Sequence, residues 1–296
     1  MPSGEFDFIR WIRGQQLPSE MVLLPAGDDL AVLRWPDDDL LLVGTDQVLD
    51  GVHFDSAVHS PREIGAKAMN RNLSDCAAMA CLPAAAVASV ALPRGTGIEY
   101  ARELYTGMRI AGERFGCALV GGDTGSWSGP LSVTVAILGR AAGIAPVKRS
   151  GARPGDSIFV TGPLGGAMRG RHLAFVPRVT EARRLAATGL VTAMIDISDG
   201  LARDLGHICR ESGVGAIIDA GAVPIHADAV AASVDGRSAF DHAAGDGEDY
   251  ELLFTASRGD FEGCFRIGKV IADGGLFVRS EGRLAPLEPR GWEHSL

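Results

Sequence analysis

Apolar positions along this chain follow two different periods. Short apolar runs of strand length alternate with longer stretches in which apolar residues recur every three or four positions. The second pattern is clearest at residues 61–79, where Met69, Leu73 and Ala77 mark one helix face and Ser60 precedes the helix as an N-cap residue. The predicted helices are residues 5–13, 61–79, 96–115, 181–187 and 201–212. The predicted strands are residues 30–33, 40–43, 83–92, 119–120, 131–140, 158–161, 193–197, 215–219 and 252–255. This alternation predicts an α/β or α+β fold.

One break in the pattern, rich in glycine and proline, lies between residues 141 and 156. The chain has 296 residues, which is enough for two domains of ordinary size. We therefore predict an N-terminal domain at residues 1–145 and a C-terminal domain at residues 146–296.

Charge and composition argue against several classes of protein. The formal net charge is −9 and no block of five basic residues occurs, which disfavours binding to nucleic acid or to anionic membranes. The N-terminal residues lack the apolar core of a signal peptide, and no uncharged apolar stretch has the length of a membrane span. The five cysteines form no CxxC pair, which favours reduced thiols over a zinc site or disulfides. We expect a cytoplasmic protein.

Five short acidic motifs stand where apolar runs stop, and we expect them at the ends of strands and helices. Clustered carboxylates disfavour one another's ionised forms, and a hard divalent cation is the usual counter-ion. Because Mg²⁺ in proteins is commonly shared between carboxylates and substrate phosphates, the motifs point to chemistry on a phosphate. The motifs are Gly27-Asp28-Asp29, Thr45-Asp46, Ser74-Asp75, Gly121-Gly122-Asp123-Thr124 and Asp196-Ile197-Ser198-Asp199-Gly200.

Each motif taken singly also has a structural interpretation. A Gly-Asp-Asp sequence is more often a turn than a ligand, and a lone histidine such as His53 is more often a surface or core residue. Asp75 lies in a helix otherwise lined by Ala, Met and Leu, so it either pairs locally or binds metal, and we favour metal. Neither a GxxxxGK[ST] loop nor a GxGxxG turn after a strand occurs, which disfavours a P-loop or dinucleotide-binding fold.

Taken in order, the motifs resemble those of the thiamine-monophosphate kinases of the AIR-synthase-like (PurM-like) superfamily. The resemblance runs over nearly the whole chain, and its ordered set of motifs is far more specific than any one of them. Besides the acidic motifs, it is carried by Gly4-Glu5-Phe6, Gly51-Val52-His53-Phe54, Asn72-Leu73, Cys76-Ala77-Ala78-Met79, Arg149-Ser150-Gly151-Ala152, residues 195–205, Glu248-Asp249-Tyr250-Glu251-Leu252 and Gly291-Trp292.

The resemblance implies a reaction and a fold. ATP and thiamine monophosphate would give ADP and thiamine diphosphate by direct in-line transfer, with several Mg²⁺ ions and no phosphoenzyme. The implied fold has two domains, and its N-terminal sheet pairs across a homodimer into a barrel while a C-terminal α/β domain covers the cleft. Pairing with a partner would also protect an exposed sheet edge.

The resemblance also implies roles for individual residues. Metal ligands are expected at Asp29, Thr45, Asp46, Asp75, Asp123, Asp196 and Asp199. Nucleotide contacts are expected at Gly122, Asp123, Arg149, Ser198 and Tyr105, and thiamine phosphate contacts at His53, Glu248 and Trp292. The groups closest to the transferred phosphoryl are expected to be Asp46, Asp75, Asp123 and Arg149. Asp28 is assigned to the turn or to the shell behind Asp29. The chain departs from the family at Gly44, where serine is common, and in residues 162–183, which are fewer than usual.

Two alternatives stay open at this point. One is another ATP-using member of the superfamily, such as an aminoimidazole ribonucleotide synthase or a selenophosphate synthetase. The first cysteine here is Cys76, so the reactive residue near the N-terminus of the latter enzymes is missing. The other is a catalytically silent protein that binds metal and nucleotide, against which the retained acidic motifs argue.

Overall fold

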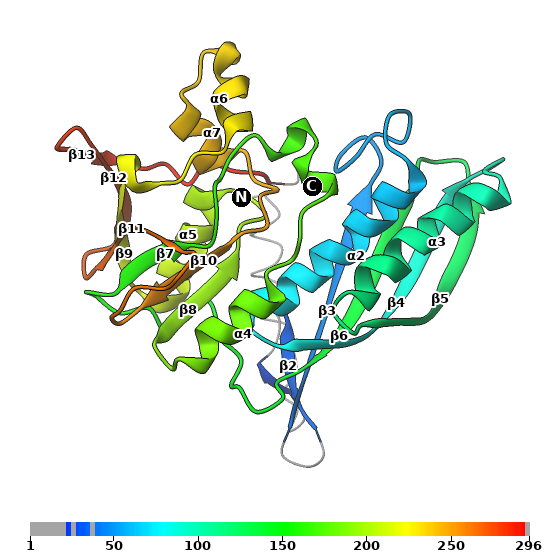
Figure 1. The fold of residues 1–296 in the computed structure, drawn as a ribbon, viewed down its shortest axis with the longest axis horizontal. Coiled ribbons are helices and arrows are strands. Elements are labelled where there is room, and N and C mark those ends of the chain that lie inside the picture. The colour runs from blue at the N-terminus through cyan, green and yellow to red at the C-terminus, as the bar shows by residue number, and fades with distance from the viewer. Residues whose placement is uncertain (1–21, 25–27, 36–38, 294–296) are drawn as a thin grey trace, which may run out of the picture.

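The computed structural model describes residues 22–24, 28–35 and 39–293, which form two mixed β-sheets with helices packed against them (Figure 1). The predicted helix at residues 5–13 lies outside the described residues. The first sheet has the strand order β1-β2-β3-β6-β4-β5, and β4 and β5 form its one parallel pair among the described strands. Its strands are β1 (Val22–Leu24), β2 (Ala31–Arg34), β3 (Leu40–Leu49), β4 (Leu82–Pro93), β5 (Ala118–Trp127) and β6 (Ser132–Arg140).

Helices α2 (Pro61–Ala78) and α3 (Ile98–Glu113) cover one face of this sheet. Helix α2 begins at a capping box in which Ser60 and Glu63 bond each other's backbone N–H groups, as expected from the N-cap prediction. The apolar stripe predicted from the three- and four-residue spacing faces inward, and Met69 and Leu73 are fully buried. Burying this stripe against the sheet supplies most of the driving force for packing here.

The second sheet has the order β13-β12-β9-β11-β7-β10-β8, and β9 and β12 are its parallel pair among the described strands. Its strands are β7 (Ser157–Val160), β8 (Val191–Asp196), β9 (Gly215–Asp219), β10 (Leu252–Ala256), β11 (Phe265–Ile271), β12 (Gly275–Ser280) and β13 (Arg283–Pro286). The helices of this half are α4 (Val179–Ala187), α5 (Leu201–Ser212), α6 (Ala227–Ala232) and α7 (Ala239–Gly245). Short 3₁₀ turns lie at η2 (Ala167–Arg169), η3 (Arg171–Leu173), η4 (Ala220–Ala222) and η5 (Ser233–Asp235).

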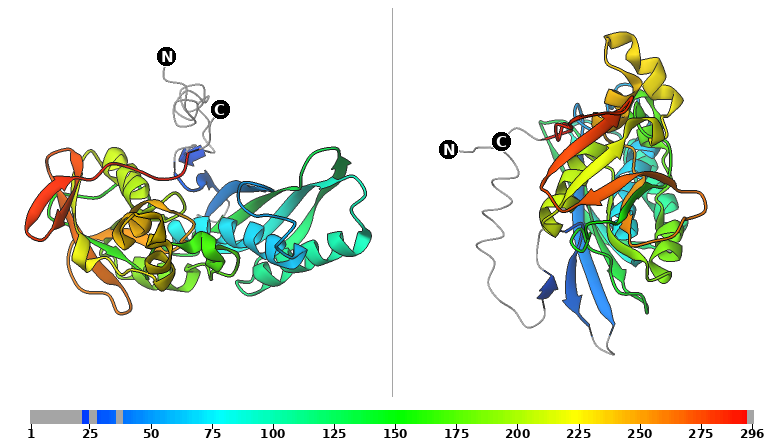
Figure 2. Two further views of the ribbon diagram at one scale, coloured as in Figure 1. Left: turned by 90° about the horizontal axis from the view of Figure 1, so that it is seen from above. Right: turned by 90° about the vertical axis from the view of Figure 1, so that its left-hand side faces the viewer.

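Helix α2 lies between the two halves of the molecule, which stand side by side (Figure 2). It packs on the first sheet and also contacts α4 and β8 of the second half. An apolar cluster at this boundary joins Ala77 to Phe159, Met194 and Phe254. Arg183 of α4 reaches back and donates to the carbonyl oxygens of residues 80, 141 and 142 at 2.9, 2.6 and 2.9 Å. The boundary is therefore a packed contact with both apolar and polar components.

The mixed α/β class predicted from the sequence is confirmed, but two acidic motifs do not lie at strand ends. Strand β3 pairs with β6 as far as Leu49, so Thr45 and Asp46 lie within it. Strand β5 continues to Trp127, so residues 121–124 also lie inside a strand. Glycine and polar residues are weak strand formers, which is why the pattern ended both strands too early. Among the described residues, none of the helices combines the length and apolarity that a membrane crossing requires.

Candidate active site

One face of α2 brings three charged side chains to the boundary between the two halves. Lys67, Arg71 and Asp75 are spaced four residues apart, which aligns them along the helix axis. Lys67 is fully buried, and the Arg71 side chain is 12% exposed. Sequence analysis singles out Asp75 alone. The four-residue spacing of these three charges, next to the apolar stripe of the helix, is the signal that would have identified the other two.

Asp75 meets two further carboxylates that come from different elements. Asp29 precedes β2 and Asp196 ends β8, and oxygens of the three carboxylates lie within 4.8 Å of one another. Ser74 Oγ donates to Asp196 Oδ2 at 2.5 Å. Burial and the charge of Asp29 raise the pKa of Asp196 to about 7. Burial and the charges of Asp196 and Asp46 raise the pKa of Asp75 well above its usual range.

This donor set fits a magnesium ion. Carboxylates so close together are stable only if protons or a cation offset their repulsion, and the raised pKa values of Asp75 and Asp196 express their burial together with that repulsion. All the donors are oxygen atoms, which Mg²⁺ prefers, and Mg²⁺ commonly completes its octahedron with water and phosphate. Asp29, Asp75 and Asp196 can therefore hold a cation where the two halves meet.

Arg149 flanks the acidic cluster formed by these three residues. Its Nε and one terminal nitrogen donate to the two carboxylate oxygens of Asp29 at 3.1 and 2.9 Å. Its backbone N–H donates to Asp28 Oδ2 at 3.1 Å, and Asp28 Oδ1 also accepts the N–H of Asp29 at 3.2 Å. Burial and the charge of Asp29 raise the pKa of Asp28 to about 6. Asp28 thus lies behind Asp29 and fastens the backbone of residue 149.

Asp46 projects from the middle of β3 toward α2. The guanidinium of Arg71 binds both of its oxygens, with Nε at 2.5 Å and a terminal nitrogen at 3.1 Å. The neighbouring Thr45 is exposed, and its hydroxyl donates to a carbonyl oxygen of β6 at 2.9 Å. A Cβ atom at Gly44 would lie 2.2 Å from Cδ2 of Leu30. The glycine therefore allows β3 to approach the segment that carries Asp29, and a larger residue would require the buried Leu30 side chain to move.

A second group of possible ligands lies just beyond β8. Asp199, Asp204 and His207 have ligand atoms within 4.8 Å of one another. Asp204 accepts the backbone N–H groups of Asp199 and Gly200 at 3.1 and 3.0 Å, which fixes the turn into α5. Burial and the charge of Asp199 raise the pKa of Asp204 well above its usual range. Sequence analysis does not name Asp204, because a buried residue inside a helix carries no motif of its own.

The predicted contacts to thiamine phosphate share one cavity of about 220 Å³. His53, Glu248 and Trp292 line it together with three other predicted site residues, Asp46, Ser198 and Asp199. Its remaining lining residues are Val52, Arg71, Met168 and Asp246. Arg71, which lines the cavity and pairs with Asp46, is one helical turn from Asp75, so the cavity opens beside the acidic cluster. Both halves of the molecule contribute to its wall.

A buried ammonium group holds the wall of this cavity together. Lys67 Nζ donates to the carbonyl oxygen of His53 at 2.7 Å, contacts Nδ1 of His172 at 2.6 Å and forms an ion pair with Glu248. Three acceptors match the three donors of an ammonium group. Burial would raise the pKa of Glu248, but the charges of Lys67 and Arg71 lower it below its usual value. Glu248 therefore presents a carboxylate to the cavity.

The His53 ring and the backbone at Glu248 also shape the cavity. His53 Nδ1 accepts the N–H of Leu49 at 3.1 Å, and burial, followed by the charge of Arg71, lowers the pKa of His53 to about 4. The neutral ring therefore carries its proton on Nε2. Glu248 has a φ of 59°, in the left-handed region, and its N–H donates to the carbonyl oxygen of Ser198 at 2.8 Å. This pairing holds the Glu248 loop against the turn that follows β8.

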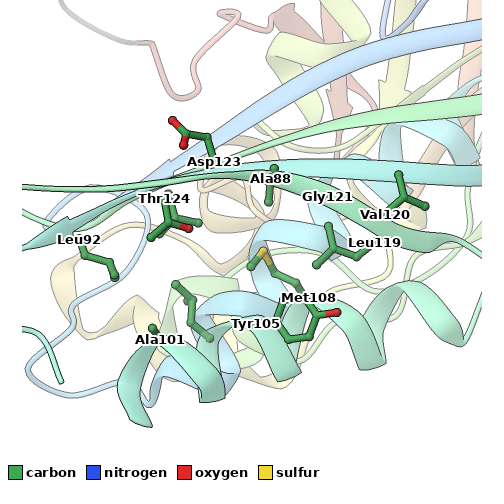
Figure 3. A pocket seen from close by; sticks show the side chains of 13 residues that line it. Ala88, Leu92, Ala101, Tyr105, Met108, Leu119, Val120, Gly121, Asp123 and Thr124 are labelled. Carbon is green, nitrogen blue, oxygen red and sulfur yellow. The ribbon is translucent and has the colours of Figure 1, made fainter. Parts of the chain in front are cut away.

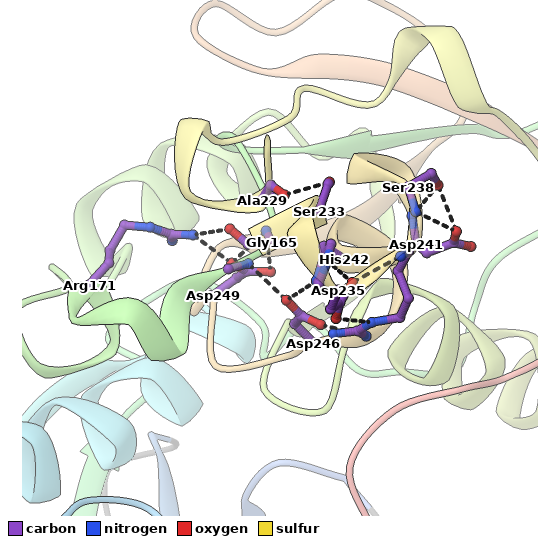
Figure 4. A network of polar contacts seen from close by, with 12 residues as sticks. Gly165, Arg171, Ala229, Ser233, Asp235, Ser238, Asp241, His242, Asp246 and Asp249 are labelled. Carbon is purple, nitrogen blue, oxygen red and sulfur yellow. Dashed lines mark hydrogen bonds and ion pairs between the residues drawn. The ribbon is translucent and has the colours of Figure 1, made fainter. Parts of the chain in front are cut away.

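The short segment between β7 and α4 is held by a polar network (Figure 4). Asp249 accepts the N–H of Gly165 at 2.9 Å and pairs with Arg171 at 2.9 Å. Asp246 accepts the N–H of Gly166 at 3.1 Å and contacts Nδ1 of His242 at 2.9 Å. Between β7 and α4 the chain forms only the 3₁₀ turns η2 and η3 among its described elements, and these turns bring residues 168 and 172 to the cavity and to Lys67.

Three predicted nucleotide contacts lie elsewhere in the chain. Tyr105, Gly122 and Asp123 line a separate cavity of about 340 Å³ between α3 and β5 (Figure 3). Gly122 on β5 and Asp46 on β3 lie in register across the sheet, with β4 and β6 between them. Three strand spacings, or about 14 Å, therefore separate the two residues. The Asp123 side chain points away from α3, whereas Thr124 points toward it. Within one chain these residues do not join the acidic cluster.

Comparison with known proteins agrees with this geometry. Residues 27–141 match the AIR synthase related protein, N-terminal domain, and residues 153–281 match the AIR synthase related protein, C-terminal domain. The thiamine-monophosphate kinase of Rhodopirellula baltica is 38% identical over 308 residues, covering 98% of this chain and 97% of that protein. The solved structure of AaThiL complexed with AMPPCP and TMP is 31% identical with a TM-score of 0.86, covering 98% of this chain and 97% of that one.

A second solved structure extends the comparison. The thiamine-monophosphate kinase from Stenotrophomonas maltophilia K279a is 32% identical with a TM-score of 0.73, and the match covers 94% of this chain and 98% of that one. The two family models together span the candidate site residues except Arg149 and Trp292, which lie outside the matched ranges. The chain belongs to the thiamine-monophosphate kinase family of enzymes.

Proposed function

We propose that this protein transfers the γ-phosphoryl group of ATP to thiamine monophosphate, which gives ADP and thiamine diphosphate, the last step of thiamine diphosphate biosynthesis. The observation that carries this proposal is the position of Asp46, which lines the cavity of His53, Glu248 and Trp292 and pairs with Arg71, one helical turn from Asp75 of the acidic cluster. A candidate cation site thus adjoins a cavity that suits an organic ligand. A related protein that is 31% identical forms a complex with AMPPCP, an ATP analogue, and TMP.

The chemistry asks little of the side chains beyond position and charge. An ionised oxygen of the acceptor phosphate forms a bond to the γ-phosphorus as the bond to the leaving oxygen of ADP breaks, so no general base is required. Several bound Mg²⁺ ions would neutralise the phosphate charges, held by Asp29, Asp46, Asp75, Asp196 and Asp199. Arg149, fixed by Asp29, would bind the transferred phosphoryl group.

The cavity supplies groups that suit the thiamine end. The Trp292 side chain is 48% exposed at the cavity wall and would stack on a ring. The Glu248 carboxylate would attract the cationic part of thiamine, and Nε2–H of His53 would donate a hydrogen bond. Ser198 would contact nucleotide phosphate from the turn before α5.

We also propose a homodimer formed through β5. This strand is an edge of the first sheet, and its residues from Gly121 to Trp127 are exposed. Val87 and Leu138, which are 44% and 38% exposed, lie on the sheet face away from the helices. Pairing with a second copy would cover both the edge and this face. It would also bring Tyr105, Gly122 and Asp123 of one copy to the nucleotide bound at the other.

Purified protein tests the proposed reaction directly. With ATP, Mg²⁺ and thiamine monophosphate, we expect ADP and thiamine diphosphate in equal amounts. Asp75→Asn serves as a matched inactive control, because the substitution keeps the shape of the side chain and removes its charge. If folded wild-type protein formed no thiamine diphosphate above the control without enzyme, the proposed function would be wrong.

Two finer parts of the proposal need their own measurements. In-line transfer predicts inversion at a chirally labelled γ-phosphorus, and retention would indicate a phosphoenzyme. Light scattering coupled to size exclusion would report the dimer, and a monomer under assay conditions would contradict it. The domain division at residue 145 and the cytoplasmic location stay predictions.

A further inference from the structure

Arg71 lies where the acidic cluster and the substrate cavity meet, and nothing in the roles assigned above uses it. It is one helical turn from Asp75 on one side and one turn from Lys67 on the other. Its guanidinium lines the cavity, pairs with Asp46 and reaches Glu248 Oε1 at 3.4 Å. A guanidinium facing an open cavity, between the metal end and the thiamine end, is well suited to bind a phosphate.

The Arg71–Asp46 pair occupies both oxygens of a proposed metal ligand. Nε binds Oδ2 at 2.5 Å and a terminal nitrogen binds Oδ1 at 3.1 Å. A divalent cation that takes an oxygen of Asp46 therefore competes with a charge-assisted hydrogen bond from Arg71. Arg149 stands in the same relation to Asp29 at the other side of the cluster. Cation binding at Asp46 would free donors of Arg71 that already face the cavity.

We propose that Arg71 binds the phosphate of the acceptor substrate, and that it exchanges Asp46 for this phosphate when a divalent cation takes Asp46. The identity of the acceptor rests on the proposed function, whereas the competition between Arg71 and the cation does not. The exchange keeps Arg71 paired with an anion throughout, so a buried charge is never left without a partner. It also couples metal binding to phosphate binding through one side chain.

The proposal predicts that a single substitution strengthens cation binding and weakens phosphate binding. Arg71→Met keeps the length of the side chain and removes the charge. Without Arg71 the cation has no competitor at Asp46, so Mn²⁺, used as a spectroscopic substitute for Mg²⁺, should bind several-fold more tightly in the absence of substrates. Thiamine monophosphate should bind about tenfold or more weakly, because charged hydrogen bonds to its phosphate are lost. Unphosphorylated thiamine should bind as it does to wild type, within about twofold.

A matched control exists on the same helix. Arg62 also forms a two-point ion pair, with Glu103 at 2.8 and 3.2 Å, but its side chain is 55% exposed and it does not line the cavity. Arg62→Met should leave Mn²⁺, thiamine monophosphate and thiamine binding unchanged. Near-ultraviolet circular dichroism and the thermal midpoint would establish that each variant is folded, and Arg71→Lys provides a second variant that retains charge and should restore part of the phosphate binding.

Equal weakening of thiamine and thiamine monophosphate binding would overturn the proposal, because it would mark Arg71 as a structural residue. Mn²⁺ binding that is unchanged or weaker in Arg71→Met would overturn the exchange. If wild type turns over normally and Arg71→Met keeps the wild-type preference for thiamine monophosphate over thiamine, the role of Arg71 is refuted and the proposed function is not. Failure of wild type to bind thiamine monophosphate would instead refute the proposed function and the acceptor assigned to Arg71.

Discussion

Replacing Lys67 by methionine should destabilise the protein more than any surface substitution. Lys67 is 0% exposed, and its ammonium is shared by the carbonyl oxygen of His53, Nδ1 of His172 and the carboxylate of Glu248. Methionine fills the same space without a donor, so three buried acceptors lose their partner. Removing one member of a buried ion pair costs about 3–5 kcal/mol. That is a large part of the total stability of about 5–15 kcal/mol that folded domains have.

The cost should depend on the charge that is left behind. In Lys67→Met the carboxylate of Glu248, whose side chain is 15% exposed, keeps Arg71 at 3.4 Å, the Tyr250 hydroxyl at 3.1 Å and Nδ1 of His172 at 3.7 Å. Glu248→Gln removes that charge, so the double variant should be no less stable than Lys67→Met. A coupling free energy of about 2 kcal/mol is therefore expected between the two sites.

A double-mutant cycle measures this coupling. Urea unfolding of wild type, Lys67→Met, Glu248→Gln and the double variant, followed by far-ultraviolet circular dichroism, gives the four unfolding free energies. Lys269→Met is the matched control, because Lys269 is exposed on β11 and its loss should cost less than about 0.5 kcal/mol. Additive effects within about 0.5 kcal/mol would refute the reasoning that the ammonium is held by Glu248.

Three further predictions concern the acidic cluster and the Glu248 loop. Asp75→Asn should lower turnover by about 100-fold or more while raising stability without Mg²⁺ by about 1 kcal/mol, because it relieves carboxylate repulsion; normal turnover would make Asp75 structural. Gly247→Ala should cost about 2 kcal/mol in urea, since Gly247 has a φ of 73° and a Cβ there would lie 2.5 Å from the carbonyl oxygen of Ser198. Gly221→Ala, with open space around its Cβ, should be neutral. Burial raises the pKa of Asp249 from 3.8 to about 7, so the folded state holds this proton more tightly and stability should fall as pH rises through that window; Asp249→Asn should flatten this slope in unfolding measured from pH 4 to 7.

The helices and strands that bury one apolar face are the parts of the fold that the sequence predicts well. Helix α2 carries both an apolar stripe and a cap, and its predicted start at Pro61 agrees with the structure. Strand β5 is different, because its glycines and polar residues pack against no described element on one face. Its extent is decided by pairing with β4, a partner distant in sequence. Single-sequence patterns do not contain that information.

The candidate site likewise has residues that the sequence predicts and residues that it does not. Asp29, Asp75 and Asp196 stand in short motifs, and the structure brings them together. Lys67 and Arg71 carry no motif, and their importance follows from a packing arrangement that sets α2 between two sheets. Local sequence reveals which residues are chemically unusual, but a buried charge becomes recognisable as part of a site only when its partners are known.

The spacing of charges on α2 orders the candidate site along the helix axis. Asp75, Arg71 and Lys67 follow one another at a rise of 1.5 Å per residue, so they span about 12 Å along the helix. Asp75 lies at the end proposed to bind cations, and Lys67 holds Glu248 at the opposite end, which is proposed to bind the organic part of the acceptor. Arg71 lies midway, which is where the phosphate of an acceptor must lie if its organic part contacts Glu248. A one-residue shift in the register of α2 would rotate all three charges by about 100°. The capping box at Ser60 and the apolar stripe on the first sheet, which set that register, therefore also position the three charges.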